Sequence, residues 1–542
     1  MIQTEKGSSL FRVSQVGYAA GLPVRAAVLA EGPVHLTDEN GNTVREISFN
    51  VPELDEVSGD RAELLDLGCL DEGVWGLACA GETRFFSVRR RPWRQITNAL
   101  IKGLYYQRCE CALDSAHAGV YTHPACHTAP AVLWEDRTVS LRIPGGWHDA
   151  GDYGKYVGPG AVAAAHLMYA HLLFPEGCSD PLDIPETGNG IPDILNEAKY
   201  ELEWILRMQK PDGAFHHKLA KARFAPFIMP QDDTQTEYLM PVSHCATAAA
   251  SACLALGSRV YREYDAAFAN AMLLSALRGW KWLKDHPDFF PFKNPEGVRT
   301  GQYGEQTDAD DRFWAACELY AATGNISFRR EAEELYARGQ NLTCFGWADV
   351  GGMGALCCLF CLKEKSGDIL YADLKRDFLS QSAQALELSE RSAYGTSLSP
   401  EGYVWGSILP IMSHAAAMIA DHLLTGNVRM RDAALVQWSY ALGLNALDIC
   451  FVTGFGENSV MNPHHRPSGS DGIDAPVPGL ISSGPNKRFP YSATRERLGD
   501  TPPARFFLDE TPSADTNEIA VYWNSIAILV ASFVNRTSKE EQ

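Results

Sequence analysis

Short apolar runs separated by turn signals fill the first ninety residues, and this pattern is typical of β-strands. Glu39-Asn40-Gly41-Asn42 and Asp71-Glu72-Gly73 supply turn chemistry between runs. The predicted strands are Phe11–Val13, Arg25–Ala30, Val34–Leu36, Val44–Phe49, Arg61–Leu67, Val74–Ala78 and Arg84–Val88. Strands this short and this closely spaced predict a small all-β, immunoglobulin-like sandwich over residues 1–90, without the Cys…Trp…Cys core of antibody domains.

From residue 93 the apolar residues recur at spacings of three and four, which is the period of an amphipathic helix. In Asp193–Met208, Leu195, Leu202 and Leu206 share one stripe. Helices are predicted near 94–107, 160–173, 193–208, 244–262, 264–284, 309–322, 328–341, 368–390, 407–424, 428–443 and 517–535. No repeat of roughly 34–47 residues is detectable, which disfavours a solenoid array. We therefore expect a mainly α protein in which residues 93–542 form a closed helical barrel.

Composition narrows the choice of partner. The 542 residues are 46% hydrophobic and 21% charged, with a net charge of −20. A chain this acidic repels phosphate backbones and anionic lipid, so neither a nucleic acid nor a membrane surface is expected as partner. Neutral or cationic small molecules and sugars remain possible ligands.

Targeting signals and disulfides are not expected. The N-terminus MIQTEKGSSLFRVSQVGY lacks a basic region followed by an apolar one, and no apolar run reaches 18 residues. We therefore expect a cytoplasmic location, or a secreted protein whose signal has been removed. The 14 cysteines are scattered, which favours buried free thiols over a disulfide framework.

Long loops are predicted at 108–159, 209–243, 285–308 and 444–516, and the first and last of these hold most of the unusual chemistry. Gly145-Gly146-Trp147-His148-Asp149-Ala150-Gly151-Asp152-Tyr153 places two carboxylates, Asp149 and Asp152, three residues apart. One carboxylate could deprotonate a water that the other orients. The alternative is a turn in which both aspartates cap backbone N–H groups.

Two further motifs lie near the C-terminus. Glu518 is expected to open an apolar helix running to about Phe533, either as a helix-capping residue or as a general acid kept protonated by neighbouring aromatics. The cluster Asn462-Pro463-His464-His465-Arg466 offers fixed donors for sugar hydroxyls. A structural His–Arg network is the alternative for that cluster.

Together these motifs resemble glycoside hydrolase family 9. The stretch Asp149–Tyr153, the run Thr453–Arg466 and the C-terminal Phe507, Asp509 and Glu518 follow its signatures, while Cys450 and Ala514 depart from them. Ser14-Gln15-Val16-Gly17-Tyr18 is similar to the opening of the immunoglobulin-like domain that one branch of the family carries.

The resemblance implies an (α/α)6 barrel and inverting hydrolysis of β-1,4-glucans. It implies Asp152 as general base, Asp149 as the residue that helps hold the water, and Glu518 as general acid. His464 and Arg466 would contact the sugar, and Tyr522 is assigned to the same contacts. Inversion requires the base and acid carboxyls to stand roughly 6.5–9.5 Å apart.

Two metal sites are candidates. Cys109, Cys126, His127 and His148 are a donor set that suits tetrahedral zinc, although their spacing is not that of a zinc finger. The alternative is buried thiols with local histidine hydrogen bonds, and Cys111 competes with Cys109. The resemblance favours structural zinc that stiffens the Asp149 loop. Calcium is a further candidate, because clustered carboxylates suit that ion; its residues would be Asp308, Asp310, Asp311 and Asp349. Capping of a helix N-terminus is the favoured alternative for these aspartates.

Several readings of the function remain open. The main one is hydrolysis of cellulose-type glucans or cello-oligosaccharides by an endoglucanase or cellodextrinase. The alternatives are an exo-β-glucosaminidase acting on chito-oligosaccharides and a non-catalytic carbohydrate-binding protein. The loops 209–243 and 285–308 could close one end of a cleft. Such a cleft would favour cleavage at the ends of the sugar chain. A zinc hydrolase is disfavoured, because four protein ligands leave no open position on the metal.

Overall fold

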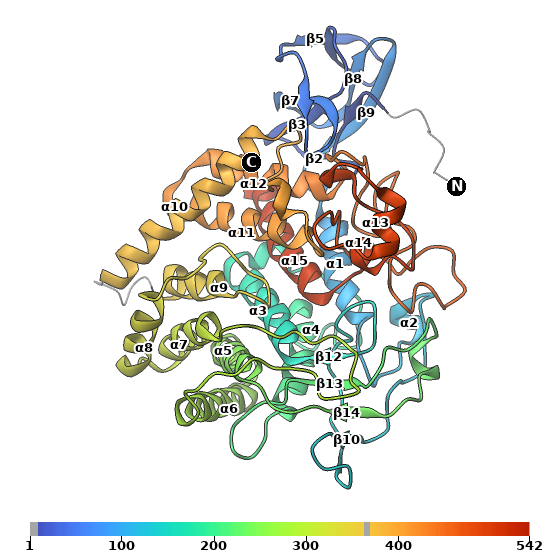
Figure 1. Ribbon diagram of the computed structural model, residues 1–542. Coiled ribbons are helices and arrows are strands. Elements are labelled where there is room, and N and C mark those ends of the chain that lie inside the picture. The colour runs from blue at the N-terminus through green and yellow to red at the C-terminus, as the bar shows by residue number, and fades with distance from the viewer. Residues whose placement is uncertain (1–8, 363–368, 541–542) are drawn as a thin grey trace.

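The computed structural model describes residues 9–362 and 369–540, and its first nine strands form a β-sandwich (Figure 1). The strands are β1 (Phe11–Arg12), β2 (Tyr18–Ala19), β3 (Pro23–Val28), β4 (Val34–Thr37), β5 (Thr43–Ile47), β6 (Glu53–Asp55), β7 (Asp60–Cys69), β8 (Gly73–Cys79) and β9 (Glu82–Arg89). All seven predicted strands are present. The sequence pattern missed β2 and β6, which are only two and three residues long.

The nine strands form two sheets packed face to face. One has the order β1-β3-β7-β6 and the other β2-β9-β8-β4-β5. Alternate residues point inward, so that Val24 and Val28 of β3, Leu65 of β7 and Leu77 of β8 join one apolar core.

The rest of the described chain is mainly helical. The helices are α1 (Arg94–Tyr105), α2 (Ser115–Ala118), α3 (Val157–Leu173), α4 (Asp193–Arg207), α5 (His244–Val260), α6 (Ala266–Asp285), α7 (Ala309–Thr323), α8 (Ile326–Tyr336), α9 (Gly351–Leu356), α10 (Ile369–Arg391), α11 (Ile408–Thr425), α12 (Val428–Ala441), α13 (Ser492–Leu498), α14 (Ala514–Asn517) and α15 (Val521–Glu540).

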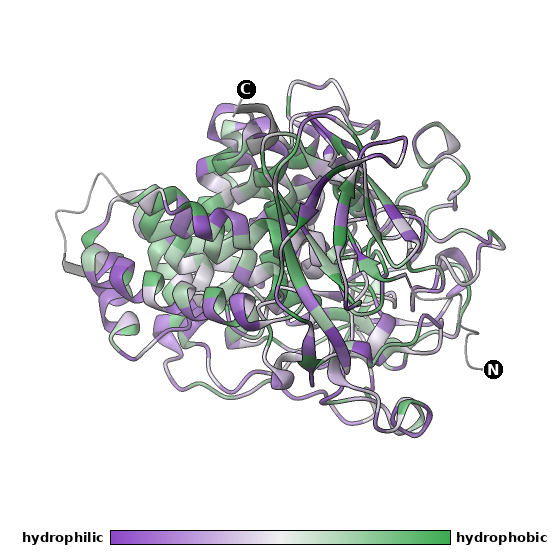
Figure 2. Ribbon diagram, turned by 90° about the horizontal axis from the view of Figure 1, so that it is seen from above, coloured by the Kyte–Doolittle hydropathy of each residue, from purple (hydrophilic) through white to green (hydrophobic). Residues whose placement is uncertain are grey.

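The long helices form an (α/α)6 barrel, as expected. In the described residues the inner ring consists of α3, α5, α7, α9, α11 and α15, and the outer ring of α1, α4, α6, α8, α10 and α12. Inner helices such as α3 and α5 are buried along almost their whole length, whereas outer helices such as α8 bury one stripe. Figure 2 shows the hydrophobic residues concentrated on the helices inside the barrel.

Parts of the barrel domain differ from the sequence prediction. The segments expected to be loops contribute a five-stranded sheet, with the order β11-β10-β14-β13-β12. Its strands are β10 (Ala131–Leu133), β11 (Ser140–Leu141), β12 (Lys155–Tyr156), β13 (Lys218–Lys221) and β14 (Glu237–Leu239). Strands of two to four residues are too short to show alternation. The sequence also missed α9, which is rich in glycine and continues into a π-helical turn at Cys357–Cys361.

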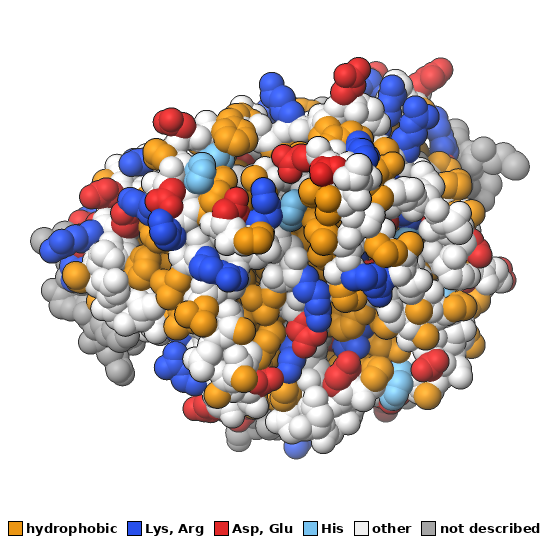
Figure 3. All heavy atoms as spheres, turned by 90° about the horizontal axis from the view of Figure 1, so that it is seen from below, with side chains coloured by type: hydrophobic (Ala, Val, Ile, Leu, Met, Phe, Trp, Pro, Cys, Tyr) orange, Lys and Arg blue, Asp and Glu red, His pale blue; other side chains and the backbone are white. Residues whose placement is uncertain are grey.

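Helix α11 is long and apolar enough to cross a membrane by length and composition, with a mean hydropathy of 1.3. It lies instead in the inner ring, where it packs against α10, α12 and α15, and 61% of it is buried inside the protein. On the face drawn in Figure 3, acidic and basic side chains are interspersed with hydrophobic ones. The negative net charge therefore does not form a single acidic patch on that face.

The sandwich rests on the end of the barrel through Gln15. Its backbone N–H donates to Leu442 O (2.8 Å), and its side chain donates to Asp448 O (2.9 Å) and accepts from Asn458 N (2.8 Å). A second junction is polar: Asp60 accepts two hydrogen bonds from Arg505 Nη2, both 2.7 Å, and one from the Tyr394 hydroxyl.

Replacing Gln15 by Ala should destabilise the protein by about 0.5–1.5 kcal/mol, because it removes the two side-chain hydrogen bonds to Asp448 O and Asn458 N, while the exposed Asn458 can turn to water and Asp448 O keeps Asn458 Nδ2 as a donor. Chemical denaturation monitored by circular dichroism measures this change. Glu39→Ala, in an exposed turn of the same sandwich, is the control and should leave the midpoint unchanged. Equal stability of the two variants would contradict the importance of the Gln15 contacts.

Candidate active site and metal centre

A glycine-rich loop carries Asp149 and Asp152 into the centre of the barrel. Gly146 lies at φ 81°, and a Cβ there would stand 2.7 Å from the Trp204 ring, so only glycine fits. The backbone N–H of Trp147 donates to Glu201 Oε2 of α4 (2.7 Å), which fixes the loop against the barrel wall.

Three segments that are distant in the sequence pair through their backbones beneath the cleft. Ala150 forms a bridge with Ala520, and His464 forms one with Glu518. Gly151 packs so closely against His464 that a Cβ would lie 2.0 Å from the His464 carbonyl oxygen. Arg466 completes the junction by donating to Gly151 O from its backbone N–H (3.1 Å) and from Nη1 (2.7 Å).

Asp149 and Asp152 are both buried, with 1% and 8% of their surfaces exposed. Burial raises the pKa of Asp149 well above its ordinary value, and the Tyr303 hydroxyl, which donates to Asp149 Oδ2, opposes that rise. Burial also raises the pKa of Asp152, while Arg466 and the N–H of Gly154 favour its charged form. Among the described residues, Asp149 Oδ1 contacts no hydrogen-bond donor.

Glu518 does not open a helix, and that prediction was wrong. It lies in extended backbone (φ −71°, ψ 160°) between α14 and α15, because its carbonyl accepts from Ser483 N (2.8 Å) and its segment pairs with His464. Trp405 Nε1 donates to Glu518 Oε2 (3.2 Å). Burial, followed by the nearby charges of Asp152 and Asp149, raises the pKa of Glu518 well above its ordinary value. The helix-capping alternative therefore does not apply.

The remaining predicted sugar contacts lie at the same cleft. His464 Nδ1 bonds to Thr511 O (2.7 Å), and burial lowers the pKa of His464 to about 4. The ring is therefore neutral near pH 7, with its proton on Nδ1, which leaves Nε2 as an acceptor. The guanidinium of Arg466 lies over the rings of Phe224 (5.7 Å) and Phe227 (5.4 Å). Tyr522 is buried at the cleft wall.

The cleft has a volume of about 520 Å³ and combines carboxyl groups with many aromatic rings. Its lining residues are Ala150, Asp152, Tyr156, Phe224, Gly301, Gln302, Tyr303, Trp347, Trp405, His464, Arg466, Tyr491, Pro512, Ala514, Glu518, Tyr522 and Trp523. Sequence reasoning missed Tyr303, Trp347 and Trp405. They come from three different segments, and no local pattern distinguishes them from core aromatics.

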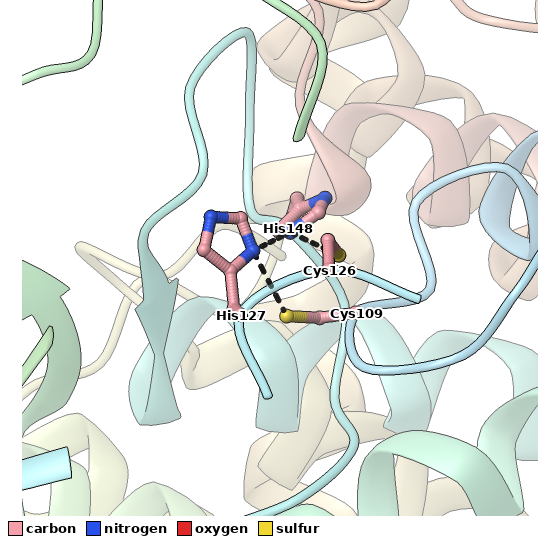
Figure 4. A group of neighbouring side chains, drawn as sticks. All are labelled: Cys109, Cys126, His127 and His148. Carbon is pink, nitrogen blue, oxygen red and sulfur yellow. Dashed lines mark hydrogen bonds between the residues drawn. The ribbon is translucent and has the colours of Figure 1, made fainter. Parts of the chain in front are cut away.

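Cys109, Cys126, His127 and His148 converge in the structure, as Figure 4 shows. All four are buried, and their ligand atoms lie within 4.8 Å of one another. The separations are 3.4 Å between His127 Nδ1 and His148 Nε2, 3.6 Å between Cys109 Sγ and His127 Nδ1, and 3.9 Å between Cys126 Sγ and His148 Nε2. Zinc bonds of about 2.0–2.3 Å give tetrahedral edges of roughly 3.4–3.8 Å, so the donors fit this ion.

Surrounding groups orient the donors. Asp233 Oδ2 lies 3.7 Å from His127 Nε2 and also pairs with Lys221. A carboxylate on the second ring nitrogen is the arrangement that fixes a metal-binding histidine. Cys111, the competitor of Cys109, lies outside the group of four.

The predicted calcium ligands lie near one another, since Asp308, Asp310 and Asp349 all raise the pKa of Glu305, but the four do not form one group of ligand atoms as the zinc donors do. Asp308 pairs with Arg312 (2.6 Å), Asp310 accepts from Val350 N (2.9 Å) and Asp349 accepts from Gly351 N (3.1 Å). Asp311 instead groups with Glu305 and Cys245, whose ligand atoms lie within 4.8 Å of one another. A thiol is a poor ligand for calcium, which takes oxygen donors, so this group does not fit that ion.

Comparisons with known proteins agree with this geometry. The family model described as "Glycosyl hydrolase family 9" matches residues 93–531. A cellodextrinase from Butyrivibrio fibrisolvens is 34% identical over 541 residues, covering 96% of this chain and 98% of the relative. The solved structure of AaCel9A in complex with cellobiose-like isofagomine has a TM-score of 0.91 and 32% identity, covering 97% of this chain and 100% of that chain.

A third similar protein is a Zn-binding triple mutant of the family 9 endoglucanase J30. Its TM-score is 0.90 and its identity 29%, over 95% of this chain and 99% of that chain. The family model matches most of the barrel, and the match to the cellodextrinase covers nearly the whole of both chains. The chain belongs to glycosyl hydrolase family 9.

Proposed function

We propose that this chain is an inverting glycoside hydrolase that cleaves β-1,4-glucosidic bonds in cello-oligosaccharides. The observation that carries the proposal is the meeting of Asp152 and Glu518 at one aromatic-lined cleft, where Tyr303, another lining residue, donates a hydrogen bond to Asp149. The relatives support the substrate class, since one is named a cellodextrinase and others endoglucanase D and cellulose 1,4-beta-cellobiosidase.

The environments of the carboxyls assign the roles. Arg466 is the strongest influence that opposes burial at Asp152, whereas at Glu518 its influence is smaller than that of the charges of Asp152 and Asp149, which raise the pKa further. The pKa of Asp152 is therefore raised less than that of Glu518. Asp152 is therefore the carboxylate and general base, and Glu518 the protonated general acid. Asp149, anchored by Tyr303 at Oδ2, offers Oδ1 to hold the attacking water.

The reaction then needs one water and no covalent intermediate. Asp152 takes a proton from the water while its oxygen attacks the anomeric carbon, and Glu518 gives its proton to the departing glycosidic oxygen. One C–O bond breaks and another forms on the opposite face of the sugar. The Nε2 atom of neutral His464 accepts a hydrogen bond from a sugar hydroxyl, and Arg466 donates at the same part of the cleft.

Zinc belongs to this proposal as a structural ion held by Cys109, Cys126, His127 and His148. It would supply a fixed tetrahedral centre next to Asp149, since His148 directly precedes that residue. We also propose the division into a sandwich of residues 1–90 and a barrel of residues 93–542. The names of the relatives do not favour the alternative of a glucosamine-releasing enzyme.

Replacing Asp152 by Asn should lower turnover of cellotetraose by about 10²–10⁴-fold, because loss of a general base has that effect. Circular dichroism and calorimetric binding of cellotetraose should remain close to those of the wild type. Asp285→Asn, at an exposed ion pair on α6, is the matched control and should retain full activity. If Asp152→Asn keeps more than about a tenth of the wild-type rate, Asp152 is not the general base.

Elemental analysis of protein purified without added metal should find one zinc per chain. Cys126→Ser should lose the ion, unfold several degrees lower and lose activity, because closed zinc sites contribute binding free energy to folding. Cys178→Ser is the control: this cysteine is also buried, lies outside the group of four and donates to Phe174 O, as a serine would. Zinc-free protein with full thermal stability would refute the structural role.

The enzyme should release mono- or disaccharide from chain ends. Phe224 and Gly301–Tyr303, from the segments expected to wall one end, line the cleft and support this mode. Carboxymethyl-cellulose should therefore keep its viscosity while cellotetraose is steadily hydrolysed. Early viscosity loss, before much reducing sugar appears, would instead demonstrate cleavage in the middle of chains. A parallel assay on chitosan pentamer tests the glucosamine alternative.

A further inference from the structure

Lys218 is a buried cation that the proposed mechanism does not use. It begins β13, is 0% exposed, and its Nζ atom donates to four oxygens. These are Gly301 O (2.6 Å), Asn294 Oδ1 (2.7 Å), Thr300 Oγ1 (3.2 Å) and Thr300 O (3.4 Å). The Tyr156 ring, which lines the cleft, lies 5.4 Å from the same atom.

This cage of oxygens fits the ammonium form of Lys218. Two of the oxygens are carbonyls and one is an amide oxygen. The Thr300 hydroxyl gives its proton to Lys221 O (3.0 Å), so its oxygen accepts as well. A neutral amine would point a lone pair at one of these acceptors, whereas the ammonium offers three protons and no lone pair.

The cage belongs to the segment that supports Asp149. Residues 294–301 hold Lys218, and the next residues, Gln302 and Tyr303, line the cleft. His217 provides a second anchor through its contact between Nε2 and Gln302 O (2.8 Å). Tyr303 lies at φ 44°, where a bulky residue needs its neighbours to hold it.

Lys218 lies near Asp152 across Tyr156. Its Nζ atom stands 5.4 Å from the centre of the Tyr156 ring, and a Cβ at Gly154 would lie 2.8 Å from the Tyr156 hydroxyl and 3.0 Å from Asp152 Oδ2. The groups that face Asp152 are Arg466 and Lys218, which favour its carboxylate, and Asp149, Glu518 and Tyr156, whose pKa values its own charge raises. Burial lowers the pKa of Lys218 to about 7, and Asp152 opposes that change. Lys218 is therefore charged over the acidic pH range in which Asp152 loses its proton.

We propose that Lys218 is a positioning residue for the reaction, which keeps Asp152 ionised by its charge and holds the 294–303 segment behind Asp149 by its hydrogen bonds. The inference rests on the proposed function, because it takes Asp152 as the base. Removing the charge should raise the pH at which Asp152 becomes active, whereas a purely structural lysine would affect the rate alone.

The test is the pH dependence of kcat/KM on cellotetraose for Lys218→Gln, Lys218→Met and Lys218→Arg. In the two neutral variants, the acid limb of the pH profile of kcat/KM should shift to higher pH by at least about half a unit, as expected for loss of a nearby charge. Lys218→Arg keeps the charge but misfits the cage, so kcat should fall while the acid limb stays in place. Lys281→Met, at an exposed ion pair on α6, is the control and should match the wild type.

The outcomes are distinct. An acid limb that does not move in a folded neutral variant overturns the proposal, and so does failure of both neutral variants to fold, which would make Lys218 purely structural. A shift in Lys218→Arg equal to that in the neutral variants also overturns it. If Asp152→Asn remains active, the proposed function itself is wrong. If Asp152→Asn is inactive and the acid limb of the neutral Lys218 variants does not move, only the proposed role of Lys218 is wrong.

Discussion

The site depends on backbone pairing between three segments that are far apart in the sequence. More than 300 residues separate the first segment from the last. Gly151 packs against His464, Ala150 pairs with Ala520, and Glu518 pairs with His464. These contacts leave no room for a side chain at Gly151. They bring together the backbones that carry the two aspartates and Glu518, so the main chain fixes the positions from which the carboxyls extend.

Burial then gives the carboxyls their chemistry. Taking three acids out of water raises the pKa of each, and the neighbours decide by how much. Arg466 and Lys218 favour the charged form of Asp152, while Glu518 faces the charges of both aspartates. In the proposed mechanism, one cleft therefore holds a base and an acid at the same pH, which is the requirement for hydrolysis with a single water.

The two candidate metal groups differ in how their donors are arranged. The donors of Cys109, Cys126, His127 and His148 match the edges of a zinc tetrahedron, and Asp233 orients one imidazole. Of the four aspartates considered for calcium, three are bonded to Arg312 or to backbone N–H groups, and the fourth lies beside Cys245. His148, one of the four zinc donors, directly precedes Asp149, so the proposed zinc site and the proposed catalytic residues share one loop.

The fold class and the family could both be predicted from the sequence. Period-two and period-3.6 patterns over long stretches predicted the sandwich and the barrel, because burial of one face repeats many times along a strand or helix. The motifs around Asp149, Asp152, His464 and Glu518 were visible because each is contiguous. Tertiary structure alone decided the rest. Tyr303, Trp405 and Lys218 act through partners distant in sequence, and Glu518 is extended because it pairs with His464, a contact that no local propensity encodes.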